Sequence, residues 1–179
     1  MIRKLLSPID RLSFSRKLIL GFLTAIILGS ILLYMPFSLQ NGQRISFLTA
    51  IFTITSAICV TGLSVIDISK VLSFEGQIIL LVFIQLGGLG VMTFSSLFFL
   101  LIGKKIGYKD RELIKEERNA ENSGEVVEFI KKIIIIVFLI EGIGAFFLTL
   151  EFLKVFNFSK ALYYGIFHSI SAFCNAGFA

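Results

Sequence analysis

Long, unbroken apolar stretches dominate this sequence, and polar positions gather in the short segments between them. Crossing the roughly 30 Å of hydrocarbon in a bilayer takes about 20 helical residues. Three apolar stretches reach that length, at residues 18–39, 77–102 and 129–153. Pro36 should stop or bend the first of them near its end, because proline lacks the amide donor. Polar residues do not interrupt them at the spacing of an amphipathic helix or strand. The pattern therefore predicts three membrane-spanning helices.

Two further apolar stretches are too short to cross a membrane. Residues 46–59 predict a helix of about 14 residues, which is roughly 21 Å long at 1.5 Å per residue. Residues 157–174 predict a second short helix. Each ends at a turn that contains one glycine, formed by Val60, Thr61, Gly62 and Leu63 and by Asn175, Ala176, Gly177 and Phe178. Because backbone that leaves a helix inside a membrane must face protein or a water-filled cavity, we predict two re-entrant helices.

The two short stretches are copies of one passage, 115 residues apart. IFTITSAICVTGL occupies residues 51–63 and IFHSISAFCNAGF occupies residues 166–178. The identical pairs are Ile51/Ile166, Phe52/Phe167, Ser56/Ser171, Ala57/Ala172, Cys59/Cys174 and Gly62/Gly177. Such a repeat predicts one membrane unit built twice. We expect a first repeat at 18–103, a cytoplasmic connector at 104–128, and a second repeat at 129–179 that stops after its turn.

Composition supports the membrane prediction, and charge orients it. The chain is 56% hydrophobic, and its mean hydropathy is +0.91. Thirteen of its seventeen basic residues fall on one predicted side: Arg3, Lys4, Arg11, Arg16, Lys17, Lys104, Lys105, Lys109, Arg111, Lys115, Arg118, Lys131 and Lys132. By the positive-inside rule, residues 1–17 form a basic cytoplasmic N-terminus of a multi-pass protein in the cell membrane. The net charge of +5 thus reflects topology, and we expect no nucleic-acid partner.

The two turns have the chemistry of an ion filter. Backbone carbonyl oxygens can replace the hydration shell of a cation without placing a fixed negative charge in the membrane. Glycine permits the unusual dihedral angles that such a loop requires. Each preceding helix points its partly negative C-terminal end toward its turn. One loop cannot surround an ion, whereas four loops around an axis can.

Four motifs then carry a resemblance to a known family: TSAICVTGL at 55–63, IQLGGLGVMTF at 84–94, GKKIG at 103–107 and HSISAFCNAGF at 168–178. Together they resemble the Trk/Ktr/HKT superfamily of potassium transporters. Within it the chain is most similar to the bacterial Ktr-type membrane subunit, because its first span lies close to the N-terminus. The resemblance implies an all-α, potassium-channel-like membrane protein. Its pore is lined by four units, each a helix, a re-entrant pore loop and a second helix, and about one and a half of them are present here.

The same resemblance implies a function and its partners. It implies a membrane subunit of a K⁺ uptake system, with K⁺ held by the backbone carbonyls of Val60, Thr61, Gly62, Leu63, Asn175, Ala176, Gly177 and Phe178. It also implies Na⁺ dependence, a homodimer in the lipid bilayer, and gating by a cytosolic nucleotide-binding ring that meets the connector. No organic cofactor is expected. Since relatives continue for two further units, we expect an N-terminal part of a longer protein.

Two other classes of function were weighed. A non-conducting membrane scaffold, or a truncated partner subunit, would account for the missing units but not for the filter-like turns. An intramembrane enzyme would need a nucleophile paired with a base, or a metal cluster. His168 and Glu141 lie on different segments and supply neither. Cys59 and Cys174 predict neither a disulfide framework nor a metal site, and enzymatic activity is not expected.

Several residues allow two interpretations from sequence alone. Gly87, Gly88 and Gly90 form either a hinge or a close helix contact. Glu141 makes either a structural hydrogen bond or part of an ion relay. His168 either braces its helix or senses protons. Asp67 either concentrates cations at the mouth of the pore or is a solvated loop acid.

Overall fold

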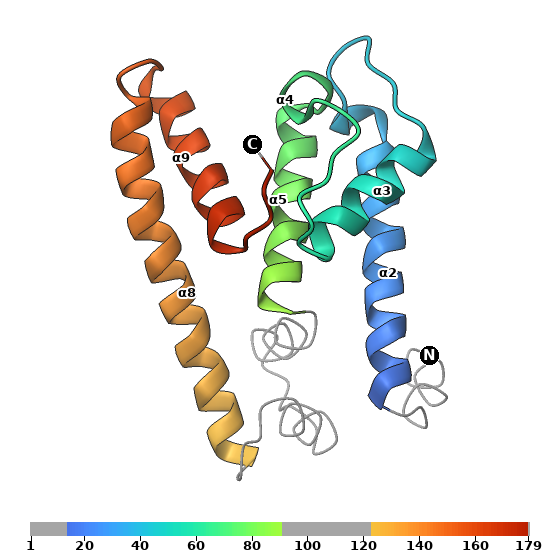
Figure 1. Ribbon diagram of the computed structural model, residues 1–179, viewed down its shortest axis with the longest axis vertical. Helices are drawn as coiled ribbons and strands as arrows, with labels where there is room; N and C mark the ends of the chain where they lie inside the picture. The colour runs from blue at the N-terminus through green and yellow to red at the C-terminus, as the bar shows by residue number, and fades with distance from the viewer. Residues whose placement is uncertain (1–13, 91–122, 179) are drawn as a thin grey trace.

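The computed structural model describes residues 14–90 and 123–178, and these ranges are helical (Figure 1). In chain order the elements are α2 (Phe14–Tyr34), the 3₁₀ helix η2 (Pro36–Ser38), α3 (Phe47–Ile58), α4 (Ile68–Val71), α5 (Phe74–Leu89), α8 (Ser123–Phe152) and α9 (Phe158–Phe173). The described ranges contain one isolated bridge, Leu39 to Leu72, and no strand. The all-α fold class is confirmed. Most of the basic residues used to orient the chain, and most of the 104–128 connector, lie outside the described residues.

The first predicted span ends earlier than expected. Helix α2 stops at Tyr34, and Met35 adopts an extended conformation (φ −65°, ψ 146°). Pro36 follows at the first position of η2. Proline disfavours helical conformation in the residue before it and has no amide hydrogen for the helix ladder. The stop expected at Pro36 is therefore confirmed, the helix does not reach residue 39, and the apolar part of α2 is the shorter stretch Ile19–Tyr34.

The second predicted span is interrupted. Helix α5 begins at Phe74, where Ser73 Oγ accepts a hydrogen bond from Gly76 N at 3.1 Å. It ends at Leu89, because Gly90 has a φ of +78° that no right-handed helix can continue. An uninterrupted helix over residues 77–102 is therefore wrong at Gly90. Residues 91–102 lie outside the described residues.

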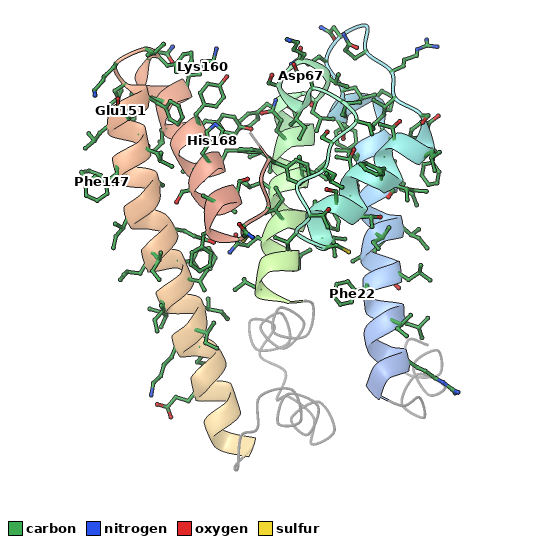
Figure 2. All side chains as sticks on the ribbon, viewed as in Figure 1. Phe22, Asp67, Phe147, Glu151, Lys160 and His168 are labelled. Carbon is green, nitrogen blue, oxygen red and sulfur yellow. The ribbon has the colours of Figure 1, made fainter. Side chains whose placement is uncertain are left out.

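The third predicted span is confirmed as a long apolar helix. Within α8, residues Lys131–Phe152 form the one helix in the described ranges that is long and apolar enough to cross a membrane. Large apolar side chains cover its outer surface. Phe147, for example, is 65% exposed and points away from α9 (Figure 2). An apolar face of this extent is costly in water and suits contact with lipid.

The helices form two groups that meet at α5. Figure 1 shows α9 beside α8 and α3 crossing α2, with α5 between α9 and α3. Helices α3 and α5 pack closely, and Ala50, Ile54, Leu80 and Ile84 of these helices are completely buried. This arrangement brings the C-terminal ends of α3 and α9 toward the same helix.

Candidate ion filter

The two short helices predicted at residues 46–59 and 157–174 are present, with their cap residues at these bounds. Helix α3 is capped by Ser46, whose Oγ accepts from Thr49 N at 3.1 Å. Helix α9 is capped by Asn157, whose Oδ1 accepts from Lys160 N at 3.1 Å. Such side chains stabilise a helix start because they satisfy amide groups that have no partner within the helix. The helices have 12 and 16 residues, and both end 115 residues apart, at Ile58 and Phe173.

Both turns have the same unusual backbone. Val60 and Asn175 each have a φ of +55°, and Gly62 and Gly177 have φ values of +73° and +69°. In each turn, two residues with positive φ therefore flank one residue with negative φ, Thr61 in the first turn and Ala176 in the second. When left-handed and right-handed backbone conformations alternate, successive peptide groups point toward one side, as a carbonyl filter requires.

Equivalent hydrogen bonds close both turns. The amides two and one positions after each helix cap donate back to carbonyls of the last helical turn: Thr61 N to Ser56 O (2.9 Å), Val60 N to Ala57 O (3.2 Å), Ala176 N to Ser171 O (2.8 Å) and Asn175 N to Ala172 O (2.9 Å). This pattern is a Schellman cap, which needs a left-handed residue directly after the cap. Asn175 is a common choice there, whereas the β-branched Val60 is strained by roughly 1–2 kcal/mol.

The structure brings the two predicted filter turns together at their glycines. A Cβ atom built on Gly177 would lie 3.5 Å from Gly62 Cα. A Cβ built on Gly62 would collide with the carbonyl oxygen of Ala176. Turns that are 115 residues apart in sequence are therefore neighbours in space, and Gly62 has no room for a side chain.

The last predicted filter residue differs between the turns. Leu63 is 61% exposed, whereas Phe178 is 3% exposed. The carbonyl oxygen of Phe178 accepts a hydrogen bond from Ser171 Oγ at 2.6 Å. In the first turn the equivalent Ser56 instead accepts a hydrogen bond from the Thr61 hydroxyl at 2.9 Å. Positions 60–62 and 175–177 thus share their geometry, and positions 63 and 178 do not.

Helix α5 packs against the ends of both re-entrant helices through adjacent glycines. A Cβ atom on Gly87 would collide with the Ile58 carbonyl of α3. One on Gly88 would collide with the Cys174 side chain at the end of α9. The close-contact interpretation therefore holds for these two glycines. Gly90 has nothing within 4 Å of a built Cβ and terminates the helix.

Gln85 is a residue of this region that our sequence reasoning missed. Its Nε2 donates to Glu141 Oε1 at 2.8 Å, and its Oε1 lies 3.8 Å from the Cys174 thiol, which donates to it. Glu141 is 4% exposed, and the structural hydrogen bond expected for it is present. The signal was available, because a polar amide within an apolar span is costly and implies a partner.

The other residues singled out in the sequence have local roles. The His168 ring packs among aromatic rings, with Phe152 at 5.4 Å and Phe167 at 5.8 Å between centroids. Cys59 is exposed and Cys174 buried, and both are free thiols. No group of three or more His, Cys, Asp or Glu side chains within residues 14–90 and 123–178 could hold a metal ion.

Asp67 caps the short helix α4. Its carboxylate accepts from Ser69 Oγ at 2.6 Å and pairs with Lys70 Nζ at 2.8 Å. The hydrogen bond from Lys70 lowers the pKa of the Asp67 carboxyl to about 2. This acid is therefore neutralised locally by its own neighbours in an exposed segment.

The site thus consists of two short helices, each of which ends at a turn with left-handed residues at equivalent positions. The family model TrkH, described as cation transport protein, matches residues 17–179. The chain belongs to this family, and the resemblance found in its motifs is confirmed. Family membership and the apolar helix Lys131–Phe152 together identify a membrane protein.

Similar proteins are named for potassium uptake. The chain is 37% identical to the potassium/sodium uptake protein NtpJ of Enterococcus hirae, over 99% of its length and 38% of that protein. It is 40% identical to the Ktr system potassium uptake protein B of Bacillus subtilis, over 90% of its length and 36% of that protein. The corresponding protein of Vibrio alginolyticus is 36% identical, with coverage of 92% and 36%. The chain thus spans less than two fifths of the length of these relatives.

Proposed function

We propose that this chain supplies two of the pore loops through which a membrane transporter takes up K⁺. The carbonyl groups of residues 60–63 and 175–178 form its contribution to the filter. The observation that carries the proposal is the shared left-handed backbone at Val60, Gly62, Asn175 and Gly177, in two turns that meet at their glycines. Strained backbone conformations of this kind are found mainly at functional sites.

The surroundings of the turns favour a cation over an anion. The C-terminal ends of α3 and α9, each equivalent to about half a negative charge, lead directly into the turns. Carbonyl oxygens provide a further set of partial negative charges without a fixed charge. Phe178 O accepts the hydrogen bond from Ser171 Oγ with one lone pair, which leaves its second lone pair for an ion. Relatives named for potassium uptake support K⁺ as that ion.

The complete pore requires further loops. Two turns cannot surround an ion, so we place this chain as about one and a half of four repeats in a longer transporter. The finer features that the family resemblance implies remain part of this proposal: Na⁺ dependence, a homodimer, a cytoplasmic N-terminus and gating by a cytosolic nucleotide-binding ring. Reversing the charges of Lys104, Lys105 and Arg111 should weaken co-purification with such a ring, and undiminished co-purification would contradict that contact.

The decisive experiment replaces filter glycines in the full-length transporter. Gly62→Ser and Gly177→Ser should lower the preference for K⁺ over Na⁺ while the protein still reaches the membrane. Gly42→Ser is the matched control, because Gly42 also has a positive φ, of +84°, but nothing lies within 4 Å of its built Cβ. Loss of selectivity in all three variants would trace the effect to backbone strain alone.

A growth assay tests the function itself. The full-length transporter should restore growth of an uptake-deficient bacterium at limiting K⁺, and a full-length Gly62→Ser variant should restore it poorly. Failure of the unaltered full-length protein, expressed and inserted, would favour a non-conducting scaffold.

A further inference from the structure

Glu141 joins α8 to two other helices at once. Its side-chain Oε1 accepts from Gln85 Nε2 of α5 at 2.8 Å. Its main-chain carbonyl accepts from Ser169 Oγ of α9 at 2.6 Å. Glu141 and Ser169 are 4% and 5% exposed; the bond between them is buried, and the bond from Gln85 is partly buried. Hydrogen bonds to a buried, potentially charged group are among the stronger ones in proteins.

Gln85 connects this site to the second filter turn. While its amide nitrogen binds Glu141, its amide oxygen lies 3.8 Å from Cys174 Sγ. Cys174 is the C-terminal cap of α9 and directly precedes Asn175, the first left-handed residue of the turn. Gly88, one helical turn from Gln85, lies against the same cysteine side chain. A chain of polar contacts therefore runs from α8 through α5 to the residue that introduces the turn.

The equivalent place in the first unit is apolar. Residues 115 positions earlier than Glu141 and Ser169 are Ile26 and Ile54. The helix crossing is otherwise alike: a Cβ on Gly29 would lie 2.8 Å from Ile54 Cγ2, and one on Gly144 would lie 2.5 Å from Ser169 Oγ. Apolar packing is thus sufficient to hold such a crossing. A buried polar group that lacks a hydrogen bond lowers stability, whereas one that is bonded fixes the relative orientation of the two helices.

We propose that Gln85 and Glu141 act as a pair that positions the second filter turn and thereby sets the discrimination between K⁺ and Na⁺. Neither side chain contacts the ion. Gln85 is held by Glu141, Cys174 is held by Gln85, and the carbonyl groups of residues 175–177 take their orientation from that cap. This inference rests on the proposed function for the identity of the transported ion. The positioning of the second turn by Gln85 and Glu141 does not depend on that identity.

Ion flux tests the role in selection. In full-length transporter reconstituted in liposomes, Gln85→Leu and Glu141→Leu should each lower the K⁺ to Na⁺ flux ratio at least about fivefold, which corresponds to about 1 kcal/mol. The double variant should lose no more than the larger single loss, because both changes break one unit. The exchange Gln85→Glu with Glu141→Gln should restore the ratio to within about twofold, since it keeps an amide against a carboxyl group. Glu151→Leu, on the same helix but exposed and paired with Lys154, is the matched control (Figure 2).

Thiol labelling tests the positioning without relying on transport. In full-length protein whose other cysteines are serine, buried Cys174 should react slowly with a maleimide. Gln85→Leu and Glu141→Leu should raise that rate at least about fivefold, and Glu151→Leu should leave it unchanged. An unchanged rate in both leucine variants overturns the proposal. A raised rate with an unchanged flux ratio also overturns it, because the pair would then be structural only. If the unaltered protein carries no K⁺, the proposed function fails, and the labelling rate still decides whether the pair positions the cap.

Discussion

The two filter turns are alike in backbone and unlike in support. Both use a Schellman cap and a left-handed glycine three residues after the cap residue. Behind the first turn, Thr61 bonds to Ser56, and the helix crossing is apolar at Ile54. Behind the second, Ser171 binds the Phe178 carbonyl, and the crossing is polar at Ser169. The comparison teaches that different side chains can support the same backbone conformation.

The glycines offer the strongest way to break this comparison. Gly62→Ala in the full-length transporter should reduce K⁺ uptake far more than Gly177→Ala. Both alanines meet strain of roughly 1–2 kcal/mol, which corresponds to about tenfold, from a positive φ. Only the alanine at 62 also collides with the Ala176 carbonyl. Initial rates of ⁸⁶Rb⁺ uptake, normalised to protein in the membrane, measure the effect, and equal losses would contradict the described approach of the turns.

The serines behind the turns should differ next in size. Ser171→Ala should lower the free energy of unfolding by about 1–3 kcal/mol, because it removes the hydrogen bond that Ser171 gives to the Phe178 carbonyl. Ser56→Ala should cost about 1 kcal/mol or less, since Thr61 is an exposed residue whose partly buried hydroxyl can bond to water instead. Denaturant unfolding of the full-length protein in detergent provides the comparison. A larger loss at Ser56 would reverse our assignment of the two roles.

The residues directly after the caps test whether the turns are interchangeable. Asn175→Val should lower the free energy of unfolding by about 1–2 kcal/mol, because it places a β-branched residue at a left-handed position. Asn175→Gly is the control and should change it by only a few tenths of a kcal/mol, since glycine adopts this conformation readily. Stability of the valine variant equal to that of the glycine variant would show that Asn175 is not left-handed in the membrane.

The smallest expected effect concerns Asp67, which lies shortly after the first turn. Its pKa is lowered to about 2 from an ordinary 3.8, so its stabilising contribution is fully present above about pH 4 and is lost only as the pH falls toward 2. Uptake by the unaltered protein and by Asp67→Asn should therefore differ by a constant factor between pH 5 and 8. Parallel pH profiles of uptake measure this, and a step near pH 6 that disappears in the asparagine variant would contradict it.

Sequence reasoning predicted the short helices better than the long ones. The bounds of α3 and α9 follow from local signals, a serine or asparagine cap at the start and a small-residue turn at the end. Among the long spans, the stop or bend expected at Pro36 is confirmed, since α2 ends at Tyr34, whereas the break at Gly90 was missed. Hydropathy continues past both residues, whereas backbone geometry does not. The proline and glycine were visible in the sequence, but only the structure shows which of the chain's glycines breaks a helix.

The amino-acid sequence by itself determined the membrane class, the repeated turn and the family, because these depend on composition, on local periodicity and on motifs that lie within a dozen residues. Only the tertiary structure decided that Gly62 meets Ala176, that Gly87 and Gly88 lie against the ends of α3 and α9, and that Gln85 links Glu141 to Cys174. These contacts join residues far apart in the chain. Their geometry depends on how closely whole helices approach, and no local pattern specifies that distance.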